Sequence, residues 1–195
     1  MKAYYEARAP EYDDWYLGLG RFDGLERPRW DDELHALERT LAAVPPVRTL
    51  DVACGTGFLT QHLCGDVSGL DQSGSMLDVA RARMPAAELV QADALPLPFA
   101  DASFDRVFTA HFYGHLEKPD RMEFLAEARR VAPELVVVDA AVRPDRERVG
   151  RQIRVLNDGT RWEVYKRYFT PAELITELGG GETLFAGRWF VAVRA

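Results

Sequence analysis

Residues 47–59 have the sequence VRTLDVACGTGFL, and this stretch decides the fold. Residues 47–52 form an apolar run after a pair of prolines, which predicts a short buried strand. Gly55 and Gly57 then predict a turn, and the apolar residues after them predict a helix that begins at Phe58. A strand, a glycine turn and a helix start together bring bare backbone and free N–H groups close to a ligand. We therefore expect a nucleotide-type cofactor site here.

The rest of the chain repeats this alternation of strands and helices. Further strands are expected at residues 67–70, 89–92, 104–110, 135–140, 183–185 and 189–193, and helices over 28–43, from 72, over 119–131 and from 170. Continuous apolar strands between helices indicate a parallel sheet covered on both faces. The tight connection through Gly187 makes the last strand antiparallel. The sequence predicts an α/β fold, a doubly wound Rossmann-like sheet of seven strands, mostly parallel with an antiparallel last strand, with helices on both faces.

One domain is expected over residues 1–195, since no linker or repeat interrupts the chain. Within it we expect an N-terminal helical cap (1–43), a cofactor-binding core (47–140) and a substrate-side, sheet-completing part (141–195). The first 17 residues are rich in aromatic side chains, which predicts either a lid over the cofactor cleft or an edge of the core. Residues 151–156 fit a helix or a strand equally well.

Composition limits the classes of function. The chain is 47% hydrophobic and 28% charged, as in soluble globular proteins, and its formal net charge of -7 argues against nucleic acid as a partner. No apolar run could span a bilayer, and early acidic residues argue against a signal peptide, so a cytoplasmic location is expected. Cys54 and Cys64 have no neighbours at metal-ligand spacing, so no metal is expected. The sequence does not choose between a monomer and a homodimer.

Three carboxylates, Asp51, Asp71 and Asp93, end the first three predicted strands. The carboxyl ends of strands in an open parallel sheet border the ligand crevice. Asp71 could bind both ribose hydroxyls of a nucleotide, but dinucleotide enzymes use the same device. Two features favour a different cofactor: Thr60 replaces the last glycine of the dinucleotide fingerprint, and Asp51 would repel a pyrophosphate. An adenosine that carries an ammonium and a sulfonium group suits these charges.

Several motifs of this sequence, in the expected order, resemble those of class I S-adenosylmethionine-dependent methyltransferases. Residues 50–57 (LDVACGTG) resemble their first motif, 69–73 followed by Met76 and Leu77 the second, and 91–105 the third stretch and the run into the fourth strand. The resemblance covers about residues 47–140. The ending, from Phe169 onward, resembles the small-molecule branch of the family, the methyltransferase-domain type 11-like branch. Two departures are Ala53, where many members have glycine, and residues 131–134, where many have a Pro-Gly-Gly turn.

The resemblance implies a set of cofactor-binding residues, namely Asp51, Ala53, Gly55, Gly57, Asp71, Gln72, Met76, Asp93, Ala94 and Leu95. Asp51 would hold the amino group of the methionine part, Asp71 both ribose hydroxyls, and Asp93 the adenine amino group. Gln72 and Met76 would flank the adenine ring. The cofactor would be S-adenosyl-L-methionine and its product S-adenosyl-L-homocysteine.

The implied activity is methyl transfer to a small-molecule acceptor by in-line displacement, achieved mainly by positioning. A general base helps where the acceptor is a hydroxyl or a protonated amine. His111 and Tyr113 follow the fourth predicted strand and are the catalytic candidates, with a structural role as the alternative for His111. Substrate-side candidates are Tyr5, Tyr12, Tyr16 and His115.

Two other functions stay open on the sequence. One is a non-catalytic module that binds S-adenosylmethionine or S-adenosylhomocysteine; the other, disfavoured by Thr60 and Asp51, is an NAD-dependent oxidoreductase. Six arginines between residues 143 and 161 could grip an anionic acceptor, form a solvated face or pair with the acidic segment 11–33.

Overall fold

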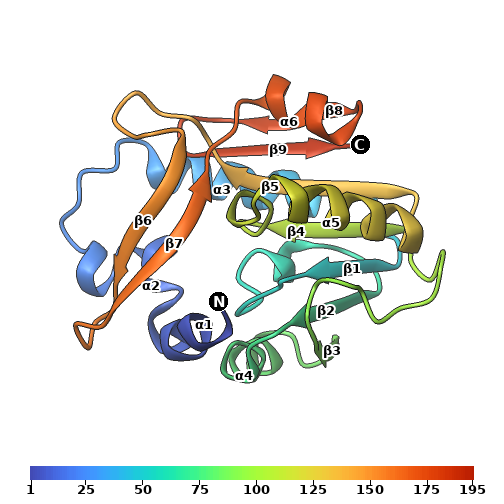
Figure 1. Cartoon of the computed structure of the whole chain (residues 1–195), viewed down its shortest axis with the longest axis horizontal. Helices are drawn as coiled ribbons and strands as arrows, with labels where there is room; N and C mark the ends of the chain where they lie inside the picture. The colour runs from blue at the N-terminus through green and yellow to red at the C-terminus, as the bar shows by residue number, and fades with distance from the viewer.

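The computed structural model describes residues 1–195 and places a seven-stranded sheet at the centre of the chain (Figure 1). The strand order is β3-β2-β1-β4-β5-β9-β8. The strands are β1 (Thr49–Val52), β2 (Val67–Asp71), β3 (Glu88–Gln91), β4 (Arg106–Ala110), β5 (Glu134–Ala140), β8 (Glu182–Ala186) and β9 (Phe190–Arg194). Strands β1 to β5 pair in parallel, and β9 runs antiparallel to both β5 and β8. The predicted α/β fold is confirmed.

Helices cover both faces of this sheet. They are α3 (Trp30–Ala42), α4 (Gly74–Arg83), α5 (Lys118–Val131) and α6 (Pro171–Leu178). Neighbouring residues of β5 enter different cores, because side chains alternate between the faces of a strand. Val137 packs in the core beneath α5 and α6, whereas Val136 and Val138 pack in the core beneath α3. Helices thus cover the two faces, and the loops that follow the parallel strands meet at the carboxyl edge of the sheet.

Of the segment expected as an N-terminal cap (1–43), α3 packs on the sheet, and the part before it consists of α1 (Lys2–Arg8), η1 (Ala9–Glu11), α2 (Asp14–Leu17) and η2 (Gly20–Phe22). The name cap is kept below for this part. A separate two-stranded sheet of β6 (Val149–Val155) and β7 (Arg161–Arg167) lies beside it (Figure 1). Tyr4 of α1 packs with Leu156 and Val164 of this hairpin, and the ring centroids of Tyr4 and Trp162 are 5.8 Å apart. Residues 151–156 are therefore mainly strand, which settles the ambiguity of the sequence.

Arg148 and Arg151 are exposed and pair with nearby carboxylates. Arg151 pairs with Glu117 and Glu163, and Arg148 pairs with Glu173. None of the six arginines pairs with a carboxylate of segment 11–33, so that interpretation is wrong.

The helix predicted from Phe58 is also wrong. Only a short 3-10 helix, η3 (Thr60–His62), forms there, and Leu63 is already extended at φ -75° and ψ 138°. Phe58 and Leu63 instead pack into the core beneath α3. Helix α3 begins two residues later than predicted, since Arg29 has a left-handed φ of 62°.

No helix of this structure is both long enough and apolar enough to cross a membrane.

Replacing Thr170 with alanine is expected to destabilise the fold by about 1 kcal/mol, because it removes an N-terminal cap. The Thr170 hydroxyl accepts a hydrogen bond from the Glu173 N–H at 3.3 Å, and Glu173 accepts one from the Thr170 N–H at 2.9 Å. Chemical denaturation measures the loss. Thr176→Ala, an exposed change in the same helix, is the control; an equal loss in both variants would contradict the capping role.

Candidate cofactor and acceptor site

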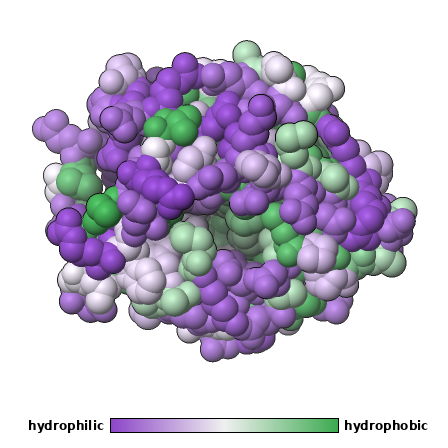
Figure 2. Space-filling model, in the orientation of Figure 1, coloured by the Kyte–Doolittle hydropathy of each residue, from purple (hydrophilic) through white to green (hydrophobic).

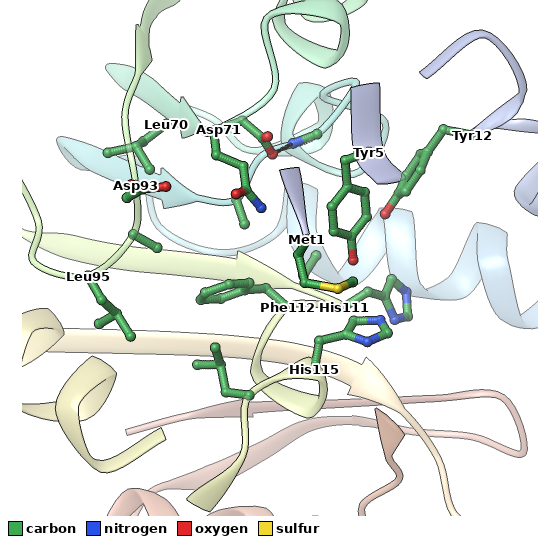
Figure 3. Close-up of a pocket in the computed structure, with 16 residues that line it drawn as sticks. Met1, Tyr5, Tyr12, Leu70, Asp71, Asp93, Leu95, His111, Phe112 and His115 are labelled. Carbon is green, nitrogen blue, oxygen red and sulfur yellow. Dashed lines mark hydrogen bonds between the residues drawn. The ribbon is translucent and has the colours of Figure 1, made fainter. Parts of the chain in front are cut away.

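A cavity of about 270 Å³ lies where the carboxyl ends of β1 to β4 meet the N-terminal cap. Its opening lies in the largely hydrophilic surface of Figure 2, as a hollow lined in part by apolar side chains. The cavity is lined by Met1, Tyr5, Tyr12, Ala53, Gly55, Leu70, Asp71, Gln72, Asp93, Ala94, Leu95, Ala110, His111, Phe112, His115 and Leu116. Figure 3 shows Asp93 and Leu95 at one end, and the two histidines with Tyr5 and Tyr12 at the other.

The glycine turn after β1 brings its backbone to the cavity. Ala53, Gly55 and Gly57 all have positive φ angles, of 60°, 56° and 74°. A Cβ on Gly55 would meet only the Tyr12 ring, at 3.8 Å, so this residue leaves open space beside the cavity. A Cβ on Gly57 would lie 2.5 Å from the Met84 side chain. Gly57 is therefore needed for packing, and it does not line the cavity.

Asp71 at the end of β2 organises this loop. Its Oδ2 accepts a hydrogen bond from the Gly55 N–H at 2.9 Å, and its Oδ1 accepts one from the Ser73 N–H at 2.9 Å. Burial raises the pKa of Asp71 above its ordinary value, and these hydrogen bonds oppose the rise. The carboxylate thus joins the two loops that border the cavity and faces the cavity itself.

Asp51 lies deeper, at the edge of a second chamber of about 10 Å³. Its side chain is buried, its Oδ2 accepts a hydrogen bond from the Thr60 hydroxyl, and its Oδ1 has no hydrogen-bond partner. Ala53, Ala110 and Tyr12 line both this chamber and the larger cavity, so the two spaces adjoin. An unpaired buried carboxylate oxygen is costly, and it suits a cationic group of a ligand.

The end of the cavity near Asp93 contains most of the residues expected around the adenine. Asp93, Ala94, Leu95 and Gln72 all line it. Met76 does not, and that prediction is wrong: its side chain is fully buried, because Met76, Leu77 and Ala80 form the stripe by which α4 packs against the sheet.

The cap covers the cavity and is attached to the cofactor loops by two carboxylates. Glu6 accepts hydrogen bonds from the N–H groups of Gly74 and Ser75, at 2.8 and 3.0 Å, at the start of α4. Asp13 accepts one from the Thr56 hydroxyl at 2.6 Å and pairs with Arg83 at 2.6 Å. The lid interpretation of the cap therefore agrees with its position. Neither carboxylate carries a sequence signal, because each bonds to residues more than 40 positions away.

Three aromatic residues of the cap were predicted on the substrate side. Tyr5 and Tyr12 line the cavity (Figure 3). Burial raises the pKa of both phenols, so they remain neutral hydrogen-bond donors. Tyr16 instead stacks on Phe58, with ring centroids 4.0 Å apart, and borders only the small chamber.

The two histidines differ in their environments. His111 has a φ of 57°, lies against Trp15, and its Nε2 is buried with no hydrogen-bond partner. Burial lowers the pKa of His111 to about 4, although Asp139 opposes this. His115 Nδ1 lies 2.7 Å from the Tyr165 carbonyl oxygen. A carbonyl can only accept, so Nδ1 donates and Nε2 keeps its lone pair.

Tyr113, the other catalytic candidate, is placed wrongly by the sequence argument. It is fully buried among Phe124 and Phe169, and its hydroxyl lies 3.2 Å from Glu177 on the side of α6. The left-handed backbone at His111 turns the chain, so that Tyr113 enters the core and does not reach the cavity.

An ion pair lies behind the histidines. Lys166 of β7 pairs with Asp139 of β5 at 2.5 Å, and both side chains are buried. Asp139 also accepts a hydrogen bond from the Gly114 N–H at 2.7 Å. Burial alone would raise the pKa of Asp139, but Lys166 and His111 hold it below its ordinary value. The pair thus joins the hairpin to the loop that carries both histidines.

Comparisons with known proteins agree with this geometry. A family model described as a methyltransferase domain matches residues 49–134. The demethylmenaquinone methyltransferase of Renibacterium salmoninarum is 35% identical over 136 residues, which cover 67% of this chain and 53% of that protein. That of Thermotoga maritima is 39% identical over 95 residues, covering 45% of this chain and 40% of the relative. The chain spans about half the length, or less, of these curated relatives.

Solved structures match over nearly the whole chain. The DhpI–SAH complex is 31% identical, covers 98% of this chain and 92% of its own, and superposes with a TM-score of 0.76. The DhpI–SAM–HEP complex is 28% identical, with coverages of 99% and 94% and the same TM-score. The chain therefore belongs to the class I S-adenosylmethionine-dependent methyltransferase family.

Proposed function

We propose that this protein transfers the methyl group of S-adenosylmethionine to a small-molecule acceptor. The observation that carries the proposal is that the carboxylates at the ends of β2 and β3 share one cavity with two histidines and two tyrosines. The family supplies the cofactor class, and the cavity, which lies beneath the cap and is lined in part by apolar side chains, supports a small acceptor. A cytoplasmic location and the choice between monomer and homodimer stay predictions.

The residues at the cofactor end fit this ligand. The unpaired Oδ1 of Asp51 suits the ammonium group, and Asp71 has the position to accept from ribose hydroxyls. Gly55 leaves room for the close approach of a ligand to its backbone. We assign adenine binding to Asp93, Ala94, Leu95 and Gln72.

At the acceptor end we assign the general base to His115 in preference to His111. The Nε2 of His111 has almost no accessible surface, and aromatic rings surround it. His115 has a defined tautomer, because the Tyr165 carbonyl oxygen fixes Nδ1–H, and its ring lines the cavity (Figure 3). Burial lowers the pKa of His115 well below its ordinary value, so the imidazole is neutral and its Nε2 carries a free lone pair.

When bound, S-adenosylmethionine supplies an activated methyl group and a neutral leaving group. The chain contributes alignment: the glycine turn and the three strand-end carboxylates fix one partner, and Tyr5 and Tyr12 can donate hydrogen bonds to the other. His115 Nε2 accepts the proton that an O–H or N–H acceptor gives up. The aromatic cap excludes water from the space between them.

The test of this function has two parts. Calorimetry with S-adenosylhomocysteine is expected to show binding to one site, and incubation with S-adenosylmethionine and a pool of small hydroxyl and amine compounds is expected to yield S-adenosylhomocysteine. Binding without turnover for any acceptor would favour the non-catalytic module, and no binding would refute the proposal.

Changing His115 to glutamine is expected to lower the rate of methylation at saturating cofactor by about 100-fold or more, because the base is lost. The dissociation constant for S-adenosylhomocysteine should hardly change. Tyr113→Phe, which removes a hydroxyl on the far side of the loop, is the matched control. An unchanged rate and pH profile in the His115→Gln variant would exclude His115 as the base.

A further inference from the structure

Strand β1 places the carboxyl group of Asp51 in the interior, where few protein groups replace the water that it loses on burial. The Asp51 side chain is 1% exposed, and its only hydrogen bond is the one that Oδ2 accepts from Thr60. Oδ1 has less than 1 Å² of accessible surface and no partner. An ionised carboxylate offers about four lone-pair positions, so one hydrogen bond leaves most of its lost hydration unreplaced.

The surroundings of Asp51 contain no balancing positive charge. Tyr12 and Tyr16 from the cap and Cys54 from the glycine turn line the small chamber, and none of them is a cation. Asp71 from β2 adds a negative charge that further disfavours ionisation. Arg83, on the outer side of the turn, is bonded to Asp13 and to the Thr56 carbonyl. No lysine, arginine or histidine lies within ion-pair distance of Asp51.

Burial and Asp71 together raise the pKa of Asp51 well above its ordinary value, and the Thr60 hydrogen bond offsets only part of this. A positively charged group beside Asp51 would lower this pKa again, and the space next to the carboxyl group limits the size of such a group. The chamber beside Asp51 has about 10 Å³ of free space, enough for roughly one water-sized group, which is also the size of a primary ammonium. It adjoins the larger cavity at Ala53 and Ala110.

We propose that ligand binding at this site is coupled to release of a proton from Asp51, which is protonated in the free protein and ionises when an ammonium group reaches the chamber. The O–H bond of the carboxyl group breaks, the proton goes to solvent, and the ammonium keeps its charge and donates a hydrogen bond to the carboxylate. The inference rests on the proposed function and adds a pH dependence to it. The amino-acid end of the cofactor, and not its nucleoside, would drive the proton release.

The sign of the dependence follows from linkage. Below the pH at which Asp51 titrates in the free protein, each binding event releases up to one proton. The affinity for the ligand therefore increases by up to tenfold for each unit by which the pH is raised. Above that pH the carboxylate is already ionised, and affinity becomes independent of pH. Asp71 also lines the cavity, but the ribose hydroxyls near it are uncharged. They do not lower the pKa of its carboxyl group as an ammonium would lower that of Asp51.

The experiment is calorimetric titration of the full chain with S-adenosylhomocysteine, between about pH 5 and pH 7.5, in buffers of different ionisation enthalpy. The expected result is a proton release that approaches one at the acidic end and declines as pH rises. 5′-Methylthioadenosine, which has the same nucleoside but no amino-acid end, should bind without releasing a proton.

Two variants make the test specific to Asp51. Asp51→Asn should abolish the proton release while weaker binding remains measurable, and Thr60→Val should extend the release to higher pH, because the hydrogen bond that favours the ionised form is lost. Infrared difference spectra should show loss of a carboxylic-acid C=O band on binding, absent in Asp51→Asn.

Heats that do not depend on the buffer at any of these pH values, with S-adenosylhomocysteine bound, would overturn the coupling and leave the proposed function intact. Equal proton release from Asp51→Asn would assign it to another group and would also overturn the proposal. No binding by the folded wild-type chain would refute the proposed function and this inference together.

Discussion

Replacing Asp71 with alanine is expected to weaken the binding of S-adenosylhomocysteine by about 100-fold or more. The carboxylate accepts hydrogen bonds from Gly55 and Ser73, and in our proposal it also binds the ribose. Two hydrogen bonds to a charged group contribute about 1.5–3 kcal/mol each, and about 1.4 kcal/mol corresponds to a tenfold change in affinity. Calorimetry or equilibrium dialysis gives the dissociation constants.

Asp66→Asn is a suitable control, because Asp66 is an exposed carboxylate just before the same strand. It should bind the ligand as the wild type does. Asp71→Asn keeps the size of the side chain but loses its charge, and its dissociation constant should lie between those of Asp66→Asn and Asp71→Ala. A change of less than threefold in Asp71→Ala would show that the ligand does not depend on the end of β2, and would contradict the cofactor assignment.

Replacing Lys166 with methionine is expected to lower the free energy of unfolding by about 3–5 kcal/mol near neutral pH, because it leaves the buried Asp139 carboxylate without its counter-charge. For a chain of this length the melting temperature should fall by roughly 10 °C. Differential scanning calorimetry and urea denaturation provide the two measurements. Arg148→Met, which breaks the more exposed pair with Glu173, should cost less than about 1 kcal/mol.

The pH dependence of this loss separates charge from packing. Lys166 holds the pKa of Asp139 below its ordinary value, so the wild type gains stability from Asp139 above about pH 4, the unfolded value, and loses it as pH falls through the lower folded value. Without Lys166 this gain is lost. The difference between wild type and variant should therefore be largest near neutral pH and should narrow in acid. A constant difference would indicate lost packing alone.

Much of the fold was predictable, because its signals are local. Apolar runs marked the strands, and Thr170–Pro171 marked the start of the last helix, which the structure places at Pro171 with Thr170 as its cap. The loop after β1 was recognisable from Gly55 and Gly57, whose positive φ angles are the property that glycine permits. Of the site, the sequence identified the strand ends with Asp71 and Asp93, since the carboxyl ends of parallel strands meet at one crevice.

The errors arose where the direction of one side chain depends on distant structure. Val149 and Ile153 of β6 are about half exposed, so apolar residues do not mark the buried face of the hairpin, and its period could not be read. At 111, a histidine in the left-handed region carries no sequence signal, yet it decides that Tyr113 enters the core. Phe58 and Leu63 imitate a helical stripe, although they serve the core beneath α3 without a helix.

The contacts of the cap also bear on the order in which the protein folds. Glu11 accepts a hydrogen bond from the backbone N–H of Asn157, a residue 146 positions away, and Tyr4 packs against Trp162. Contacts of such sequence separation form late, since the loop between them must close first. On the ribosome, Tyr4 and Glu11 must therefore wait for the β6–β7 hairpin to be synthesised. The roof of the cavity can thus settle only after residue 167 has been synthesised.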